Sequence, residues 1–162
     1  MRDTILYGDC LQTLDTLKSH ISIGICDKPR MCVTSPPYYG LRDYGGEDNQ
    51  IGHEDTPEEF ISNLVNIFSK VKDCLADDGT MWLNMGDSYY NYRPGKGQAL
   101  VKQTVANSKQ DLPDKCARRG NKLDGLKEKD LIGIPWMLAF ALRADGWHLR
   151  QDIIWHKPNP MP

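Results

Sequence analysis

Neither long apolar runs nor paired cysteines occur in this sequence, and each absence excludes a class of protein. No stretch of the 162 residues approaches the roughly 18 consecutive apolar residues that a membrane-spanning helix needs, and the N-terminus (Met1-Arg2-Asp3) lacks the apolar core of a signal peptide. The five cysteines are odd in number and form no C-x-x-C pair, which argues against a disulfide framework and against a zinc site. We therefore predict a cytoplasmic protein with free thiols, no membrane contact and no metal centre.

The length predicts a single domain that can bury a core, and the apolar and charged fractions of 40% and 26% are those of an ordinary globular protein. The net charge of −2 hides an asymmetry. Residues 91–130 carry ten Lys and Arg against five Asp and Glu, so this stretch is +5 and the remainder of the chain is −7. A basic stretch in an acidic chain indicates either contact with a polyanion or a solvated loop, and charge alone leaves both open.

Apolar periodicity alternates between strands and helices along the chain. The clearest helix begins at a capping box, Thr56-Pro57-Glu58-Glu59, and we expect it to end at Gly79 and to cover a sheet. The helix that includes Ile134–Leu142 is apolar nearly all round, which predicts packing on more than one side, with Gly146 as its stop. A shorter helix is predicted around Leu11–Leu17, and strands are predicted at Thr4–Tyr7, Met31–Val33, Met81–Met85 and Trp147–Trp155. Repeated strand–helix–strand units imply a mostly parallel α/β sheet whose functional site lies at the carboxyl ends of its strands.

Several small or aromatic side chains lie in or beside these apolar runs, and we expect them in the core rather than in a site. They are Trp82 and the four cysteines Cys10, Cys26, Cys32 and Cys74.

The stretch Thr34–Gly40 reads Thr-Ser-Pro-Pro-Tyr-Tyr-Gly and directly follows the predicted strand at Met31–Val33. Pro36 and Pro37 supply no N–H, so a turn here offers a hydroxyl and backbone carbonyls with few competing donors. Tyr38 places an aromatic face beside those acceptors. This combination suits a planar group that carries an amine, although a plain structural turn is built from the same residue types.

Thr34–Tyr38 resembles the catalytic motif of the DNA amino-methyltransferases, which methylate the exocyclic amine of cytosine or adenine with S-adenosylmethionine. Four further stretches match that family in order along the chain: Gly8–Leu11, Trp82–Tyr89, Ile132–Trp136 and Trp155–Pro162. The resemblance implies a restriction-modification type enzyme with a Rossmann-like sheet, acting on a base that has been flipped out of double-stranded DNA.

The resemblance also implies roles for individual residues. The implied catalytic residues are Ser35, Pro36, Pro37 and Tyr38: the Ser35 hydroxyl and the Pro36 carbonyl would accept hydrogen bonds from the target amine, and Tyr38 would stack on the base. In the family, serine at this position is commoner with N4 of cytosine as the target, and Asp or Asn with N6 of adenine. Asp9 is implied to contact the adenine ring of the cofactor, and capping of the helix that follows is an equally open alternative.

Residues 91–128 show no helical or strand period and exceed ordinary loop lengths. Because this stretch is basic and follows a turn (Gly86–Tyr90) that walls the target-base pocket in the family, we expect a flexible loop that tracks DNA phosphates. The predicted DNA contacts are Arg93, Lys96, Lys102, Lys115, Arg118 and Arg119.

Part of the family pattern is missing. Members with this motif order carry a glycine-rich cofactor strand, Phe-x-Gly-x-Gly, and an acid for the ribose after the catalytic half, whereas the only G-x-G here is Gly95-Lys96-Gly97 in the basic stretch. In the family's strand order 3-2-1-4-5-7-6, the chain supplies strands 3, 4, 5 and 6, so strands 3 and 6 lose their neighbours.

We therefore expect residues 1–162 to form the N-terminal, catalytic-motif half of a methyltransferase domain. Its fold would be an incomplete Rossmann-like α/β sheet with flanking helices, completed by a C-terminal segment or a second chain. Alone, the chain is expected to bind S-adenosylmethionine poorly and to show little activity. The alternatives are a catalytically inactive DNA-binding remnant and a methyltransferase of RNA or small molecules, and the Ser-Pro-Pro-Tyr form of the motif counts against the latter.

Overall fold

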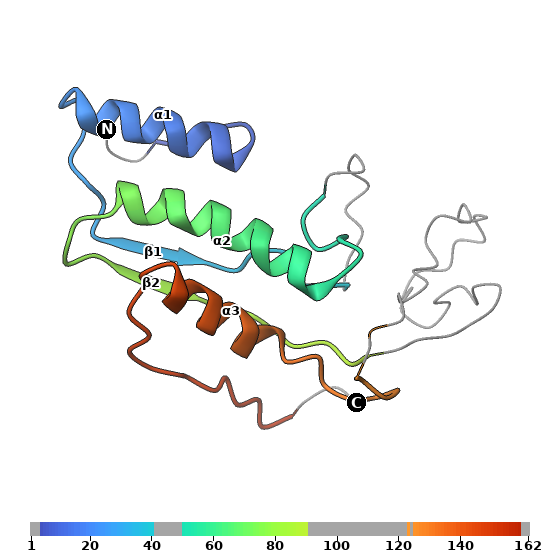
Figure 1. Cartoon of the computed structure of the whole chain (residues 1–162). Coiled ribbons are helices and arrows are strands. Elements are labelled where there is room, and N and C mark those ends of the chain that lie inside the picture. Colours follow the sequence, from blue (N-terminus) through green and yellow to red (C-terminus); the bar gives the residue numbers. More distant parts are fainter. Residues whose placement is uncertain (1–3, 41–49, 91–122, 124, 160–162) are drawn as a thin grey trace, which may run out of the picture.

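The computed structural model describes residues 4–40, 50–90, 123 and 125–159. Five elements follow one another in the order helix, strand, helix, strand, helix (Figure 1). They are α1 (Cys10–Ser22), β1 (Met31–Thr34), α2 (Pro57–Cys74), β2 (Thr80–Leu83) and α3 (Ile134–Ala144). The unit β1–α2–β2 is a strand–helix–strand crossover between two parallel strands, which confirms the predicted α/β arrangement of the chain.

Strands β1 and β2 pair in parallel, with Met31 opposite Thr80 and Thr34 opposite Leu83. Side chains alternate between the two faces of the sheet, and the helices of the described ranges cover one of these faces. On the covered face, Met81 and Leu83 pack against the helical core. On the other face Val33 is 71% exposed and Trp82 is 49% exposed, so the expectation that Trp82 belongs to the core is wrong.

Two of the predicted strands do not form. Residues 4–7 and 147–155 have no strand structure, and both segments carry exposed apolar side chains such as Ile5 and Ile154. A strand exists only where a neighbour accepts and donates its backbone hydrogen bonds, and the described residues offer these segments no such neighbour. They are the two segments that the strand order of the resembled family leaves without partners.

Helix α2 begins as predicted, because the Thr56 hydroxyl accepts a hydrogen bond from the backbone N–H of Glu59 at 3.2 Å and Pro57 occupies the first turn. It ends at Cys74 rather than at Gly79, because the backbone of the C-cap residue Leu75 is extended. Gly79 instead closes the turn into β2, where its N–H donates to the Ala76 carbonyl at 2.8 Å.

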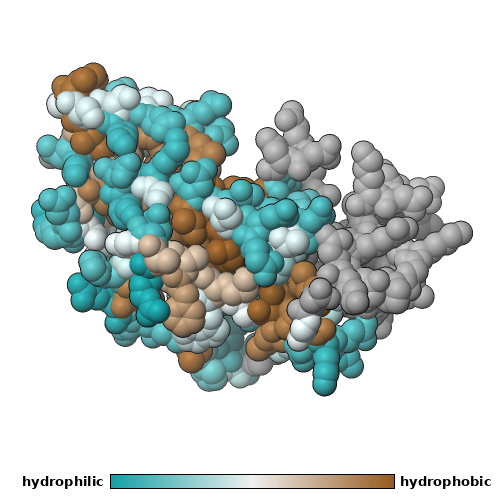
Figure 2. Space-filling view, in the orientation of Figure 1, coloured by the Kyte–Doolittle hydropathy of each residue, from teal (hydrophilic) through white to brown (hydrophobic). Residues whose placement is uncertain are grey.

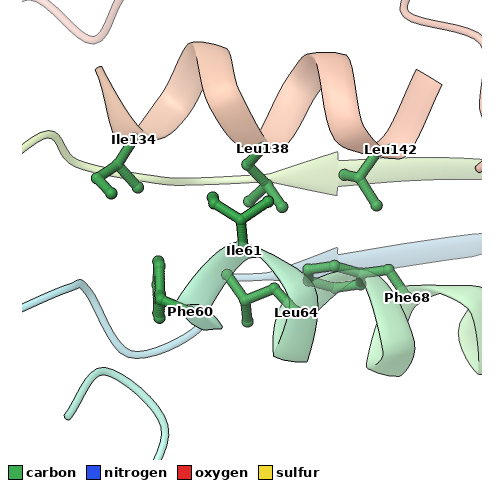
Figure 3. Packing of buried hydrophobic residues seen from close by; sticks show 7 residues of the cluster. All are labelled: Phe60, Ile61, Leu64, Phe68, Ile134, Leu138 and Leu142. Atoms are coloured by element: carbon green, nitrogen blue, oxygen red, sulfur yellow. The ribbon is translucent and has the colours of Figure 1, made fainter. Parts of the chain in front are cut away.

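The core lies between α2 and α3, above the covered face of the sheet (Figures 1 and 3). In Figure 3 the side chains of the two helices point toward one another. The cluster consists of Phe60, Ile61, Leu64 and Phe68 from α2 and Ile134, Leu138 and Leu142 from α3. The α3 residues recur every four positions and so form one stripe.

The opposite side of α3 is not buried as the sequence led us to expect. Trp136 is 53% exposed and Phe140 is 51% exposed, so α3 packs along one face only. The helix stops where predicted: Gly146 adopts a φ of 94°, its N–H donates to the Arg143 carbonyl, and the N–H of Trp147 donates to the Leu142 carbonyl. These two bonds are those of a Schellman cap, which requires the left-handed backbone that glycine accepts most easily.

Helix α1 contains no fully buried residue; it contacts α2, and two exposed ion pairs join the two helices. Lys18 pairs with Asp73, and Lys70 pairs with Asp15, each at 2.6 Å. In the view of Figure 2 the surface over α1 and α2 is mostly hydrophilic, and hydrophobic atoms gather where α2 meets α3.

The cysteines also lie nearer the surface than their apolar neighbourhoods predict. Cys74 is buried, Cys26 and Cys32 are half-buried, and Cys10 is exposed, and all four are free thiols. The core prediction is therefore confirmed for Cys74 and wrong for Cys10.

Candidate functional site

The carboxyl ends of β1 and β2 meet at one edge of the sheet. The N–H of Asn84 donates to the Thr34 carbonyl at 2.9 Å, which continues the pairing of the two strands by one step. The turn that begins at Ser35 therefore lies beside the turn that begins at Asn84. Because the carboxyl ends of parallel strands are where open α/β sheets bind ligands, this edge is the candidate site.

Hydrogen bonds converge on the hydroxyl of Tyr38. The side-chain amide of Asn84 donates to it from Nδ2 at 3.0 Å. The Ser35 hydroxyl donates to the same oxygen at 3.4 Å, the outer limit of a hydrogen bond. Ser35 is exposed while Pro36, Pro37 and Tyr38 are half-buried, so the structure brings the predicted motif together with an asparagine 46 positions beyond Tyr38.

Two glycines allow the chain to pass close to Tyr38. A Cβ at position 86 would lie 2.9 Å from Cε2 of the Tyr38 ring, so the ring packs directly on the backbone of Gly86. A Cβ at position 52 would lie 2.9 Å from the Tyr38 carbonyl oxygen, and Gly52 also has a φ of 93°. Both positions require glycine for close approach, and Gly52 requires it for its backbone conformation as well.

The turn after β2 connects this edge to α3. The carboxylate of Asp87 accepts hydrogen bonds from the backbone N–H groups of Gly133 and Ile134 at about 3.0 Å, at the end of α3 where the N-cap residue Gly133 has no side chain. Ser88 donates from its hydroxyl to the Tyr39 carbonyl at 2.8 Å. A carboxylate at a helix N-terminus meets unpaired N–H groups and the positive end of the helix dipole, so Asp87 fixes the start of α3 against this turn.

The sequence analysis placed Asp87 and Ser88 in the turn Gly86–Tyr90, which walls the target-base pocket in the family, but gave neither residue a role, and it did not single out Asn84. The available signal was their position: these polar residues lie in the turn after the strand that neighbours the motif strand.

Asp9 caps helix α1. Its Oδ1 accepts hydrogen bonds from the backbone N–H of Leu11 at 3.0 Å and of Gln12 at 3.2 Å, and the residue is exposed. The capping alternative is therefore confirmed. Contact between Asp9 and a cofactor remains a prediction.

Comparison with known proteins identifies the family. A family model described as DNA methylase matches residues 30–162. The chain belongs to the DNA methylase family.

Relatives of this DNA methylase chain include several bacterial type II methyltransferases. The chain is 48% identical to the type II methyltransferase M.Cfr9I of Citrobacter freundii over 159 residues, which is 98% of the chain and 48% of the relative. It is 49% identical to M.XycI of Xanthomonas campestris pv. cyanopsidis, with the same coverage, and 44% identical to M.SmaI of Serratia marcescens over 98% of the chain and 49% of that relative. The chain thus spans about half the length of the curated relatives it matches, and no solved structure matches it.

The predicted DNA contacts of this DNA methylase chain lie outside the described residues. These are Arg93, Lys96, Lys102, Lys115, Arg118 and Arg119. The residues that flank the stretch are held together: Tyr89 and Leu131 form an antiparallel bridge, and the N–H of Tyr90 donates to the Asp130 carbonyl at 2.8 Å. The two described flanks of the basic stretch therefore lie side by side.

The described part of the DNA methylase chain shows neither a thiol with a lowered pKa nor a cluster of metal ligands. Burial raises the pKa of the Cys32 and Cys74 thiols, and burial followed by the charge of Asp9 raises the pKa of Cys10, so these groups stay protonated at neutral pH. Among the described residues no group of three or more His, Cys, Asp or Glu side chains could hold a metal ion. None of the described helices is both long enough and apolar enough to cross a membrane.

Proposed function

We propose that the chain is the catalytic-motif half of an S-adenosylmethionine-dependent DNA amino-methyltransferase of the restriction-modification type. Its target would be the exocyclic amine of a flipped cytosine (N4) or adenine (N6). One observation carries the proposal: the Ser35–Tyr38 turn lies at the carboxyl end of β1, with Tyr38 fixed by Asn84 from the neighbouring strand. The names of the relatives, all type II methyltransferases, support the same reaction class.

The motif suits an amine because it presents acceptors. A base amine is a poor nucleophile, since its lone pair is delocalised into the ring, and acceptors that hold its protons favour the localised form that attacks. The Ser35 hydroxyl and the Pro36 carbonyl would be those acceptors, while Pro36 and Pro37 add no competing N–H. The same oxygens would stabilise the positive charge that develops on nitrogen during transfer. S-adenosylmethionine, when bound, would supply the methyl group as an electrophilic sulfonium substituent.

The base specificity and the DNA contacts are part of the same proposal. Serine in the first position of the motif favours N4 of cytosine over N6 of adenine as the target. Tyr38 would stack on the flipped base, and the basic stretch that begins at Arg93 would hold the phosphate backbone of double-stranded DNA.

The chain offers only part of a cofactor site. Asp9 is the one residue implied for the cofactor, and its Oδ1 is already engaged with the start of α1. A glycine-rich turn after a strand, which would cradle the cofactor, does not occur at the ends of β1 or β2. We infer that residues equivalent to the unmatched half of the relatives complete both the cofactor pocket and the sheet, either as a C-terminal segment or as a second chain.

A second candidate is a catalytically inactive DNA-binding remnant. It is favoured by the lack of a glycine-rich cofactor motif together with the charge of +5 in residues 91–130. The two candidates differ in what happens when the missing half is supplied.

Isothermal titration of S-adenosylmethionine decides between them. We expect no binding by the chain alone, and micromolar binding with methylation of DNA once the unmatched half of M.Cfr9I is added. Ser35→Ala should abolish methylation while leaving DNA binding unchanged. Salt-dependent DNA binding without cofactor binding, even in the presence of the added half, would establish the remnant. Micromolar binding by the chain alone would contradict the half-domain proposal.

A further inference from the structure

We propose that Asn84 is a positioning residue for the amine-accepting turn, acting through the hydroxyl of Tyr38. The inference deepens the proposed function and rests on it. Asn84 is joined to the motif strand twice: its backbone N–H donates to the Thr34 carbonyl at 2.9 Å, and its side-chain Nδ2 donates to the Tyr38 hydroxyl at 3.0 Å. The backbone hydrogen bond fixes Asn84 beside the end of β1, and the side-chain hydrogen bond then holds the Tyr38 hydroxyl at a fixed place relative to β2.

The direction of the hydrogen bonds matters for Ser35. An amide nitrogen can only donate, so the Tyr38 oxygen must accept from Asn84. The Ser35 hydroxyl lies 3.4 Å from the same oxygen, and a phenol oxygen that accepts from Asn84 keeps one further lone pair to which Ser35 can donate. In the proposed arrangement the Ser35 proton points toward Tyr38, and the lone pairs of Ser35 are left to accept a proton of the target amine.

Different neighbours contact different parts of Tyr38, and Asn84 contacts its hydroxyl. The ring packs on Gly86, and the Tyr38 carbonyl lies against Gly52, so ring and backbone are bounded on separate sides. Asn84 itself is exposed, so its side chain is not part of the packed core. Without Asn84, the Tyr38 hydroxyl oxygen loses a donor. Tyr38 can then donate its own proton to the Ser35 hydroxyl and occupy the Ser35 lone pair that the target amine needs.

Two substitutions distinguish two roles of Asn84: holding the Tyr38 hydroxyl in place, and making that hydroxyl accept rather than donate the hydrogen bond. Asn84→Ala removes the contact. Asn84→Asp keeps the size of the side chain but replaces the amide donor with an acceptor, so Tyr38 must donate to it and the direction is reversed. Asn66, an exposed asparagine of α2, is the matched control when changed to alanine.

The first measurement needs no activity. With 3-fluorotyrosine placed at position 38 of the chain, we expect Asn84→Ala and Asn84→Asp each to move the fluorine resonance, and Asn66→Ala to leave it in place. A resonance that stays at its wild-type position in Asn84→Ala would overturn the proposed contact.

The second measurement uses the chain completed with the unmatched half of M.Cfr9I. Asn84→Ala is expected to lower kcat about tenfold, the effect of one hydrogen bond, with little change in KM for the cofactor, whereas Asn84→Asp keeps a hydrogen bond to the Tyr38 hydroxyl and should lower kcat less. In a Tyr38→Phe background, Asn84→Ala should cause no further loss, because the group through which it acts is gone. Losses that multiply would show that Asn84 has a merely structural effect and would overturn the inference.

The two measurements fail separately. If the completed protein transfers no methyl group in its wild-type form, the proposed function fails. The fluorine measurement still decides whether Asn84 holds Tyr38.

Discussion

At the scale of single residues, Gly86 decides how close Tyr38 lies to the end of β2. Alanine at this position would place Cβ 2.9 Å from Cε2 and 3.1 Å from Cδ2 of the Tyr38 ring. The ring is a side chain that can swing away, so we expect Gly86→Ala to change the free energy of unfolding by about 1 kcal/mol or less, but to displace Tyr38 from Asn84. The fluorine resonance at position 38 should move as in Asn84→Ala, and methyl transfer by the completed protein should fall at least tenfold.

Gly24→Ala is the control for that change, because Gly24 has a φ of 76° with nothing within 4 Å of its added Cβ. It should cost about 1 kcal/mol of stability through backbone strain and leave the Tyr38 resonance unchanged. A Gly86→Ala variant with an unmoved resonance and normal transfer would contradict the close packing of Tyr38 on Gly86.

The sequence predicted one half of this site and missed the other for a physical reason. Ser35–Tyr38 is a contiguous motif, so the sequence alone indicates that hydrogen-bond acceptors and an aromatic ring lie close together. Asn84 and Gly86 contact Tyr38 only because Thr34 lies opposite Leu83 in the parallel register. Nothing local to residues 84–86 specifies that register, because it depends on how the α2 crossover brings β2 beside β1.

At the scale of elements, Asp145 connects the end of α3 to α2, and this connection depends on pH. Its carboxylate accepts hydrogen bonds from the Ser69 hydroxyl at 2.8 Å and from the Lys72 ammonium at 3.0 Å. The Ser69 hydroxyl, followed by Lys72, holds the pKa of Asp145 below its ordinary value. Because the pKa is lower in the folded state, the stabilisation is complete above the unfolded-state pKa of about 3.9 and is lost as pH falls through the folded-state pKa.

Asp145→Asn should therefore lower the free energy of unfolding by a constant amount between about pH 5 and pH 8, with the difference from wild type narrowing below about pH 4. Urea unfolding at a series of pH values measures this difference. Asp27→Asn, at an exposed position in the loop before β1, provides the matched control and should show no such pattern. A difference that persists undiminished at pH 3 would contradict the role of the Asp145 charge.

Helices and strands differed in how well the sequence predicted them. Helix α2 carries its own start signal in Thr56 and Pro57, and α3 carries its stop in Gly146, so their caps were predicted correctly. Residues 4–7 read as a short strand and residues 147–155 alternate as a strand does, yet a strand depends on a partner that is not encoded in the segment itself. The exposed side of α3 and the exposed face of the sheet have the same explanation, since their apolar residues were counted as core without a partner to cover them.

At the scale of the whole molecule, the described residues cover the sheet on one side only. Parallel sheets are normally covered on both faces, and a two-stranded sheet is marginal by itself. Here α2 and α3 cover one face, while Met31, Val33 and Trp82 are exposed on the other. The chain spans about half of its relatives, and the proposal that the unmatched half completes it predicts that this half supplies the covering layer and the strands that would pair with residues 4–7 and 147–155.

Val33→Glu tests this arrangement. Val33 is 71% exposed, so we expect the substitution to leave the stability of the chain alone nearly unchanged. Against a covering layer, the new carboxylate would be buried without a partner, which should weaken binding of the unmatched half of M.Cfr9I at least a hundredfold in isothermal titration. Asn66→Glu introduces the same charge on the exposed side of α2, away from the sheet, and should bind as the wild type does. Equal binding by Val33→Glu and Asn66→Glu would mean that the unmatched half docks on a different face and that the apolar face of β1 and β2 is exposed in the complete protein as well.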